Sequence, residues 1–108
     1  LKEKLKKLLD HNVIHSKPGQ NQIRSMGIIT GGANSNWIDC INEDLDSYLT
    51  GEMSEHDWHE AKESNIHFFA GWHNATEQFG IQSLLKKIHD DFPEENFQLF
   101  YIPSNNPA

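Results

Sequence analysis

A histidine and a glutamate stand four residues apart in the segment His73-Asn74-Ala75-Thr76-Glu77. On a helix, this spacing places both side chains on one face, with Cβ atoms ~5–6 Å apart. One divalent cation could then accept a nitrogen from His73 and an oxygen from Glu77, each at ~2.0–2.2 Å. Asn74 and Glu77 also have the spacing of a helix-capping box, which needs no metal. The spacing alone leaves metal binding and capping both open.

A second group of histidines and carboxylates lies upstream, where His56 and Glu60 are four residues apart, as are His59 and Glu63. A short exposed helix produces such pairs by chance, so a solvated polar face is the favoured interpretation. His59 is the better functional candidate of the two histidines. It flanks the apolar face beside Trp58 and could point along the edge of a sheet.

Three further features have both a functional and a structural interpretation. Glu52 follows an apolar segment and a glycine, so it could face a ligand or simply solvent. The glycine-rich loop 31–35 could cradle an anion with its backbone amides or form a tight turn, and it lacks the order of a dinucleotide or P-loop motif. His67 and Cys40 are better explained as a hydrogen-bonded core histidine and an inert, partly buried thiol.

The spacing of apolar residues predicts short strands that alternate with helices. We expect strands at 23–30, 47–50, 66–70 and 97–102, a turn at 17–21, and helical segments over 1–9, over 37–45, from Ser54 and from Asn74. Ser54 and Asp57 have the spacing of a capping-box-like pair. Alternation of this kind predicts a three-layer α/β unit with a mainly parallel or mixed sheet of about four strands. The last strand could be antiparallel at an edge.

The candidate residues follow the predicted strands. In open sheets of this type, ligands bind beyond the carboxyl ends of the strands. The loop 31–35 and the segments 50–52 and 71–73 all lie at such ends. We therefore expect them to share one edge of the sheet and to bring Glu52 and His73 to the same side.

Composition limits the possible partners. The 108 residues include 16 acidic and 9 basic side chains, and the net charge of −7 disfavours nucleic acid and anionic membranes. The single cysteine excludes an intramolecular disulfide and suits a reducing compartment, so we expect a cytoplasmic protein. No apolar run approaches ~18–20 residues, so no membrane span is expected.

Four segments taken together resemble the C-terminal half of the Nif-three-like family. Its members are called dinuclear metal centre hexameric proteins or GTP cyclohydrolase 1 type 2 homologues. The matching segments are 27–33, 46–55, 67–77 and the tail 102–108, and the similarity extends from about residue 23 to the C-terminus. Any one segment is a weak signal, whereas the ordered set is specific.

The resemblance implies that His73 and Glu77 are ligands in a site that binds two divalent metal ions. Their chemistry fits Zn, Mn, Fe or Ni. The resemblance also implies that His59 and Glu52 either lie behind the metal ligands and contact them or face the substrate, with His59 as a possible proton shuttle in catalysis. The chain departs from the family at Asn74, where a second histidine is frequent, and at 79–80, where two glycines are usual.

The family's remaining ligands, a His-His pair and an Asp, have no counterpart here, and only 22 residues precede the first predicted strand. One histidine and one glutamate cannot hold two metals, because each cation normally needs several protein ligands. We therefore expect residues 1–108 to form a single α/β unit of a longer two-domain chain. The missing N-terminal half would supply the other ligands, and the resemblance implies a homo-hexamer.

The function that the resemblance implies is metal-dependent hydrolysis of a small or nucleotide-like substrate, as in a GTP cyclohydrolase 1 type 2-like protein. The isolated chain is expected to be inactive. The alternative is a non-catalytic oligomeric assembly or adaptor protein with a structural metal site.

Overall fold

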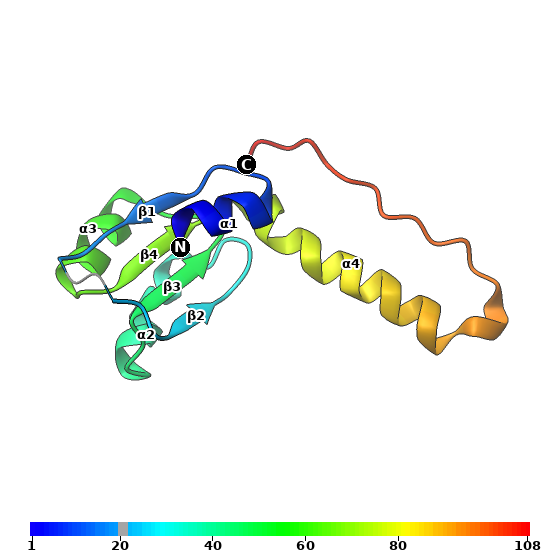
Figure 1. Cartoon of the computed structure of the whole chain (residues 1–108), viewed down its shortest axis with the longest axis horizontal. Coiled ribbons are helices and arrows are strands. Elements are labelled where there is room, and N and C mark those ends of the chain that lie inside the picture. Colours follow the sequence, from blue (N-terminus) through cyan, green and yellow to red (C-terminus); the bar gives the residue numbers. More distant parts are fainter. Residues whose placement is uncertain (20–21) are drawn as a thin grey trace.

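The computed structural model describes residues 1–19 and 22–108, and in this part helices surround a four-stranded sheet (Figure 1). The predicted turn at 17–21 includes Gln20 and Asn21, which lie outside the described residues. The α-helices are α1 Lys2–Leu9, α2 Asp39–Asn42, α3 Glu55–Glu63 and α4 His73–Asp91. The strands are β1 Ile14–Ser16, β2 Met26–Ile28, β3 Ser47–Thr50 and β4 His67–Ala70. Short 3-10 helices span Asn34–Ile38 and Pro93–Glu95.

The sheet has the strand order β1-β4-β3-β2. Strands β2, β3 and β4 are parallel, and β1 is antiparallel to β4. Each parallel crossover passes through a helical segment, as the alternation of helices and strands requires. The predicted mixed α/β sheet of about four strands is confirmed.

Helical layers cover both faces of the two central strands. Successive strand residues point to opposite faces. Leu49 and Phe69 pack against α1 and the start of α4, in one core cluster. Tyr48 and Phe68 pack against α3 and the helical segment 34–42, in a second cluster. These two cores make the predicted three layers.

Three details of the predicted fold are wrong. Residues 97–102 form no strand, because no backbone partner for them exists in the described part of the chain. The antiparallel edge strand is instead β1, a three-residue segment that the apolar spacing does not indicate. In addition, α4 begins at His73 rather than at Asn74.

The start of α3 is tied to the neighbouring layer through Asp57. Ser54 caps the helix by accepting from the Asp57 amide, and the Asp57 side chain accepts from the Ser54 amide, so the predicted capping box is confirmed. The same buried carboxylate accepts from Trp37 Nε1 at 3.0 Å and from Asn34 Nδ2 at 2.8 Å. One aspartate therefore fixes α3 against the segment that follows the glycine-rich loop.

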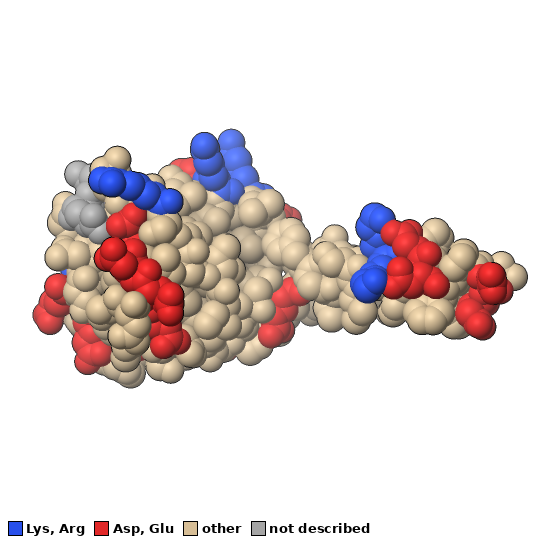
Figure 2. All heavy atoms as spheres, turned by 90° about the horizontal axis from the view of Figure 1, so that it is seen from below, with Lys and Arg blue, Asp and Glu red and all other residues tan. Residues whose placement is uncertain are grey.

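The helix α4 leaves the body of the molecule after its first turns, and we call residues 80–102 the arm (Figures 1 and 2). Within α4 only Ala75 and Thr76 are buried. The arm gives the chain its elongated dimensions of 53 × 28 × 22 Å. The tail beyond it returns to the body, where the Asn74 amide donates to the Ala108 oxygen at 3.2 Å. Among the described residues, no helix has both the length and the apolar character needed to cross a bilayer.

Candidate functional site

The three segments at the carboxyl ends of the parallel strands meet at one edge of the sheet, as predicted. The Gly51 amide donates to the Gly31 oxygen at 2.9 Å, and the Gly71 amide donates to the Thr50 oxygen at 2.9 Å. The Thr50 hydroxyl adds a second donor to the Gly31 oxygen at 3.1 Å. This backbone network places Glu52 and His73 side by side.

The imidazole of His73 lies between two carboxylates. Its Nδ1 is 2.7 Å from Glu52 Oε1, and its Nε2 is 3.2 Å from Glu77 Oε1. All three side chains are about half exposed, so the group is open to solvent. The hydrogen bond to Glu52, followed by the negative charges of Glu77 and Glu52, raises the pKa of His73 above its usual value.

The first turn of α4 produces the contact between His73 and Glu77. His73 is the first residue of the helix, so Glu77 lies one turn further along the same face. The capping position is held by Trp72, which makes no side-chain capping bond, while the Asn74 amide group points to the Ser104 oxygen at 3.5 Å. The capping-box alternative for Asn74 and Glu77 is therefore not realised.

Two glycines permit the close approach of the loops. A Cβ on Gly51 would lie 2.5 Å from the Gly31 oxygen and 2.7 Å from His73 Cα, distances that no side chain tolerates. Gly31 has a positive φ of 74°, a conformation that glycine adopts readily. A Cβ there would lie 2.6 Å from Glu77 Oε1. The glycine-rich loop is thus a tight turn whose Gly31 amide already donates to Thr76 Oγ1 at 3.1 Å, which favours the structural interpretation over an anion cradle.

Two buried threonines support the site and were not foreseen from the sequence. Thr76 Oγ1 accepts from the Gly31 amide at 3.1 Å, and Thr50 donates to the oxygen of the same residue. The hydroxyls therefore hold Gly31 from two elements, α4 and β3. Thr50 ends a predicted strand and Thr76 directly precedes Glu77. These positions were the only signs in the sequence that the two residues support the site.

His59 lies in a different environment. Its ring contacts Trp58 with centroids 4.9 Å apart, and it lines a hollow of about 230 Å³ together with Met53 and Ser54. Among the described residues, no hydrogen bond or ion pair joins His59 to the Glu52, His73 and Glu77 group. His56, Glu60 and Glu63 are exposed, in agreement with a solvated helix face. The catalytic role of His59 stays a prediction.

The two residues interpreted as structural are buried. His67 lies within β4, and its Nδ1 is 3.1 Å from His15 Nε2, so it is a hydrogen-bonded core histidine. Cys40 is a free thiol whose pKa is raised by burial, and it contacts the Ser47 oxygen at 3.6 Å. The predicted burial of both side chains and the predicted hydrogen bond of His67 are confirmed.

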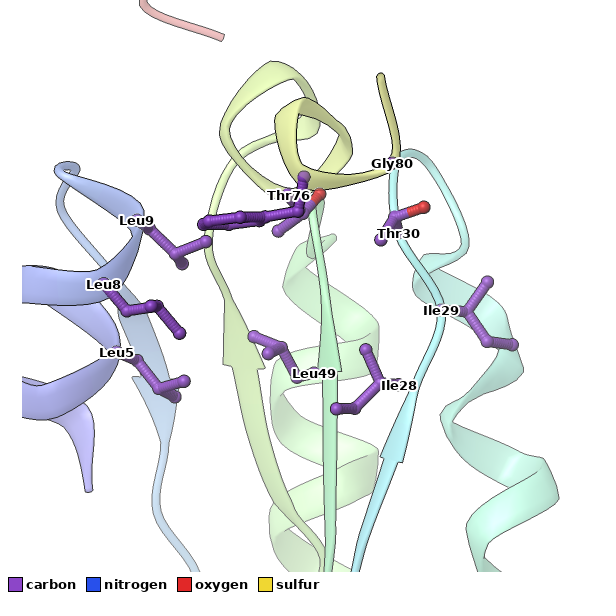
Figure 3. Close-up of a pocket in the computed structure, with 10 residues that line it drawn as sticks. Leu5, Leu8, Leu9, Ile28, Ile29, Thr30, Leu49, Thr76 and Gly80 are labelled. Atoms are coloured by element: carbon purple, nitrogen blue, oxygen red, sulfur yellow. The ribbon is translucent and has the colours of Figure 1, made fainter. Parts of the chain in front are cut away.

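An apolar cavity of about 260 Å³ opens beside the site, between α1, the edge of the sheet and α4 (Figure 3). Thr76 connects it to the Gly31 loop, and Phe79 and Gly80 line its α4 side. Leucines and isoleucines make up most of the remaining wall: Leu5, Leu8, Leu9, Ile28, Ile29 and Leu49. Glu52, His73 and Glu77 are not among its lining residues, so the cavity is a neighbour of the candidate site.

The geometry of His73 and Glu77 fits two ligands of one cation. Donors that each lie ~2.0–2.2 Å from the same ion are roughly 3 Å apart, close to the 3.2 Å between His73 Nε2 and Glu77 Oε1. Glu52 binds the opposite ring nitrogen, where carboxylates orient metal-binding histidines. In the part of the chain that the structure describes, no three His, Cys, Asp or Glu side chains converge on a common metal position. A metal ion held by His73 and Glu77 would therefore need further ligands from outside the described residues.

Comparison with known proteins places the chain in context. A family model described as Duf34/NIF3 (NGG1p interacting factor 3) matches residues 1–107. A "GTP cyclohydrolase 1 type 2 homolog" from Pasteurella multocida is 49% identical over 87 residues, which are 80% of this chain and 33% of that protein. The protein of the same name from Haemophilus influenzae is 35% identical over 108 residues, covering 98% of this chain and 41% of the relative.

Solved structures share the fold. Protein ybgI, of unknown function, superposes with a TM-score of 0.89 at 27% identity, over 99% of this chain and 42% of its own. A Bacillus cereus protein related to NIF3 superposes with a TM-score of 0.77 at 21% identity, over 94% of this chain and 30% of its own. The chain thus spans less than half the length of these relatives.

Proposed function

The chain belongs to the Duf34/NIF3 family, and from this premise we propose that it supplies two ligands, His73 and Glu77, to a divalent metal centre. The observation that carries the proposal is the 3.2 Å separation of His73 Nε2 and Glu77 Oε1, with Glu52 held on Nδ1. A second protein segment completes the coordination and gives a two-metal site. The combination of imidazole and carboxylate suits Zn, Mn, Fe or Ni.

The proposed chemistry is metal-dependent hydrolysis of a small or nucleotide-like substrate. The names of the relatives, GTP cyclohydrolase 1 type 2 homologs, support this substrate class. Bound metal would supply a water of lowered pKa and polarise the scissile group. Glu52 accepts a hydrogen bond from Nδ1–H, which would leave the lone pair of Nε2 free for a cation that His73 shares with Glu77. His59 is the proposed proton shuttle.

The proposed partners follow from the incomplete coordination. The chain provides two donors, so the remaining ligands come from the N-terminal half that the relatives possess, within a homo-hexameric assembly. The buried free thiol of Cys40 is compatible with the reducing conditions of the cytoplasm, which is the proposed location.

Metal titration tests the ligand assignment. Zn²⁺ or Mn²⁺ is titrated into the 108-residue chain and into a His73→Ala/Glu77→Ala variant. We expect weak binding by the chain and none by the variant, because both proposed donors are removed. The matched control is His56→Ala/Glu60→Ala, which deletes an exposed pair with the same spacing and should bind like the parent. Unchanged affinity in the first variant, or tight binding of two metals by the chain alone, would refute the assignment.

A second candidate function is that of a non-catalytic assembly or adaptor protein with a structural metal site. The exposed apolar residues of the arm favour it, since such surfaces mark sites of protein association. The two functions differ in turnover. A screen of nucleotides and phosphoesters with added divalent metal, on the metal-loaded assembly, should detect hydrolysis if the protein is an enzyme, and no turnover favours the adaptor.

A further inference from the structure

Trp72 joins β4 to α4 in a backbone conformation that is rare for a residue of its size. Its φ is 71° and its ψ is 145°, outside the left-handed helical region and close to a region that glycine alone populates. The other non-glycine residues with positive φ in the described part of the chain are of types that tolerate it: Asp10, Asp44, Asn65 and Asn96. The backbone at Trp72 is therefore strained, and the surrounding structure must hold it.

The Trp72 side chain has a second unfavourable feature. Its Nε1 is buried and has no hydrogen-bond partner among the described residues, whereas most buried donors in native structures are paired. The ring packs against the core cluster that includes Leu9 and Ala75, and its centroid lies 5.4 Å from that of the His11 ring. Apolar packing, rather than hydrogen bonding, therefore keeps the ring in place.

The backbone is fixed on both sides of this turn. The Gly71 amide donates to the Thr50 oxygen at 2.9 Å, which ties the start of the turn to β3. The Trp72 oxygen accepts from the Thr76 amide at 3.1 Å and from the Thr76 hydroxyl at 3.0 Å, inside the first turn of α4. Between these two anchors, the dihedral angles of Trp72 set the position at which His73 enters the helix.

His73 tolerates little displacement from this position. A Cβ added to Gly51 would lie 2.7 Å from His73 Cα, so the two backbones are in close contact. The imidazole also reaches Glu52 at 2.7 Å and Glu77 at 3.2 Å. Glu77 shares the helix with His73, whereas Glu52 belongs to the loop after β3. A different conformation at Trp72 would therefore separate His73 from Glu52 and leave the pair within the helix intact.

We propose that Trp72 is a positioning residue for the candidate metal centre, whose packed ring holds the glycine-like turn that presents His73 Nδ1 to Glu52. This inference rests on the proposed function of His73 as a metal ligand. Strained conformations persist only where the surrounding structure determines them, and they gather at functional sites. Without the ring, a Cβ at this position favours other backbone conformations, and His73 loses its contact with Glu52.

The tautomer of His73 tests the proposal in the absence of metal. Long-range proton–nitrogen NMR spectra, recorded at a pH where the imidazole is neutral, distinguish a proton on Nδ1 from one on Nε2. In the parent chain we expect the Nδ1–H tautomer, because Glu52 accepts from Nδ1. Trp72→Ala should give a mixture of tautomers, since alanine keeps the Cβ but has no ring to hold the turn.

Two further variants separate the ring from the backbone. Trp72→Gly removes the ring but permits the positive φ, so its Nδ1–H population should lie between those of the parent and Trp72→Ala. Trp72→Phe keeps an apolar ring and removes the unpartnered N–H, so it should retain the Nδ1–H tautomer. Ile66→Ala, which removes buried packing in the second core cluster, is the matched control. It should lower the melting temperature and leave the His73 tautomer unchanged.

Zinc titration of the same variants measures the consequence for binding. We expect Trp72→Ala to bind Zn²⁺ at least about tenfold more weakly than the parent chain, as for other residues that orient a metal ligand. Trp72→Gly should lie between these two, and Trp72→Phe and Ile66→Ala should bind like the parent. If the parent binds no Zn²⁺, the metal assignment fails, whereas the tautomers still decide whether Trp72 positions His73.

Four results would overturn the proposal. In the first, the parent chain lacks the Nδ1–H tautomer. In the second, Trp72→Ala retains the parent tautomer. In the third, Trp72→Gly is no closer to the parent than Trp72→Ala, so the backbone conformation has no influence. In the fourth, Trp72→Phe gives the same mixture as Trp72→Ala, so the ring does not hold the turn. If Trp72→Ala does not fold, the other two variants decide: the Nδ1–H population must be retained in Trp72→Phe and reduced in Trp72→Gly.

Discussion

The His73 ring is held on both nitrogens by carboxylates from different parts of the chain. Glu52 comes from the loop after β3, and Glu77 comes from the next turn of α4. The ring orientation is therefore set by two elements at once. If His73 bound a metal ion, this arrangement would direct Nε2 towards the ion and make Glu77 the second ligand.

Changing Glu52 should weaken the site without unfolding the chain. Glu52→Gln keeps the shape of the side chain but removes the charge opposite Nδ1, so we expect about 10–100-fold lower Zn²⁺ affinity in the assembled protein. Melting temperature should change little, because the side chain is about half exposed. Glu55→Gln, at a nearby exposed acid, is the control, and equal affinity in both variants would argue against an orienting role.

The two glycines 51 and 80 should respond oppositely to alanine. In Gly51→Ala the new Cβ would lie 2.5 Å from a backbone oxygen, so we expect the free energy of unfolding to fall by about 1–3 kcal/mol. Gly80 lies inside α4 with nothing within 4 Å, so Gly80→Ala should gain about 0.5–1 kcal/mol. Urea unfolding of both variants measures the difference, and a stable Gly51→Ala would contradict the close-approach argument.

At the scale of residues, the sequence predicted that His73 and Glu77 lie together, but not what holds them in place. The four-residue spacing of His73 and Glu77 becomes contact as soon as a helix includes both. Glu52 could be placed at the same edge because it follows a parallel strand. Thr50 and Thr76 could not be identified, because their role depends on where the Gly31 backbone lies, which only the fold determines.

Among the elements, the pairing of β1 with β4 was missed for a physical reason. β1 contains three residues, too few to show the alternation that identifies a strand. Its partner lies some fifty residues further along the chain, with His15 opposite Phe69. Long-range pairing of this kind leaves no local pattern in the sequence of β1. The strands β3 and β4, in contrast, have apolar sequences that identify them.

The same pairing should make stability depend on pH. Burial, then the neighbouring His67, and then Lys2, Lys17 and the N-terminal ammonium lower the pKa of His15 to about 4. Below pH ~6.5, His15 therefore binds a proton in the unfolded state but not in the folded state. The contribution of neutral His15 to the free energy of unfolding is complete above that pH and declines as the pH falls towards 4. The loss reaches roughly 3 kcal/mol at most.

Urea unfolding at pH 7 and pH 5 measures this effect. His15→Phe retains a ring to stack on Phe69, 4.1 Å from the present imidazole, but cannot be protonated. We expect its stability to fall less between the two pH values than that of the parent chain. Parallel losses in the two proteins would show that other groups cause the pH dependence.

For the molecule as a whole, the three-layer body was predictable and the arm was not. Alternating strands and helices imply the body directly. The apolar pattern of 97–102 predicts a strand, but a pattern within one segment does not show whether a hydrogen-bonding partner for it exists. The predicted strand therefore remains unpaired among the described residues.

Substitutions in the arm and in the core should have separable effects. Phe100→Asp/Ile102→Asp alters exposed residues, so we expect little change in melting temperature and less binding of a hydrophobic dye. Leu9→Ala, in the buried core, should reduce the free energy of unfolding by about 2–5 kcal/mol. Dye fluorescence and thermal melting of the two variants test this division. A large drop in melting temperature for the arm variant would mean that the tail stabilises the isolated chain.

The continuity of α4 has a mechanical consequence. One uninterrupted helix, roughly 28 Å long, has His73 and Glu77 in its first turns and Asp91 at its far end. Glu52 belongs to the body and does not move with that helix. Any tilt imposed on the far end would therefore be transmitted to His73 and Glu77 as a displacement against Glu52. A contact made at the far end of α4 would alter the geometry of the candidate site through one rigid helix.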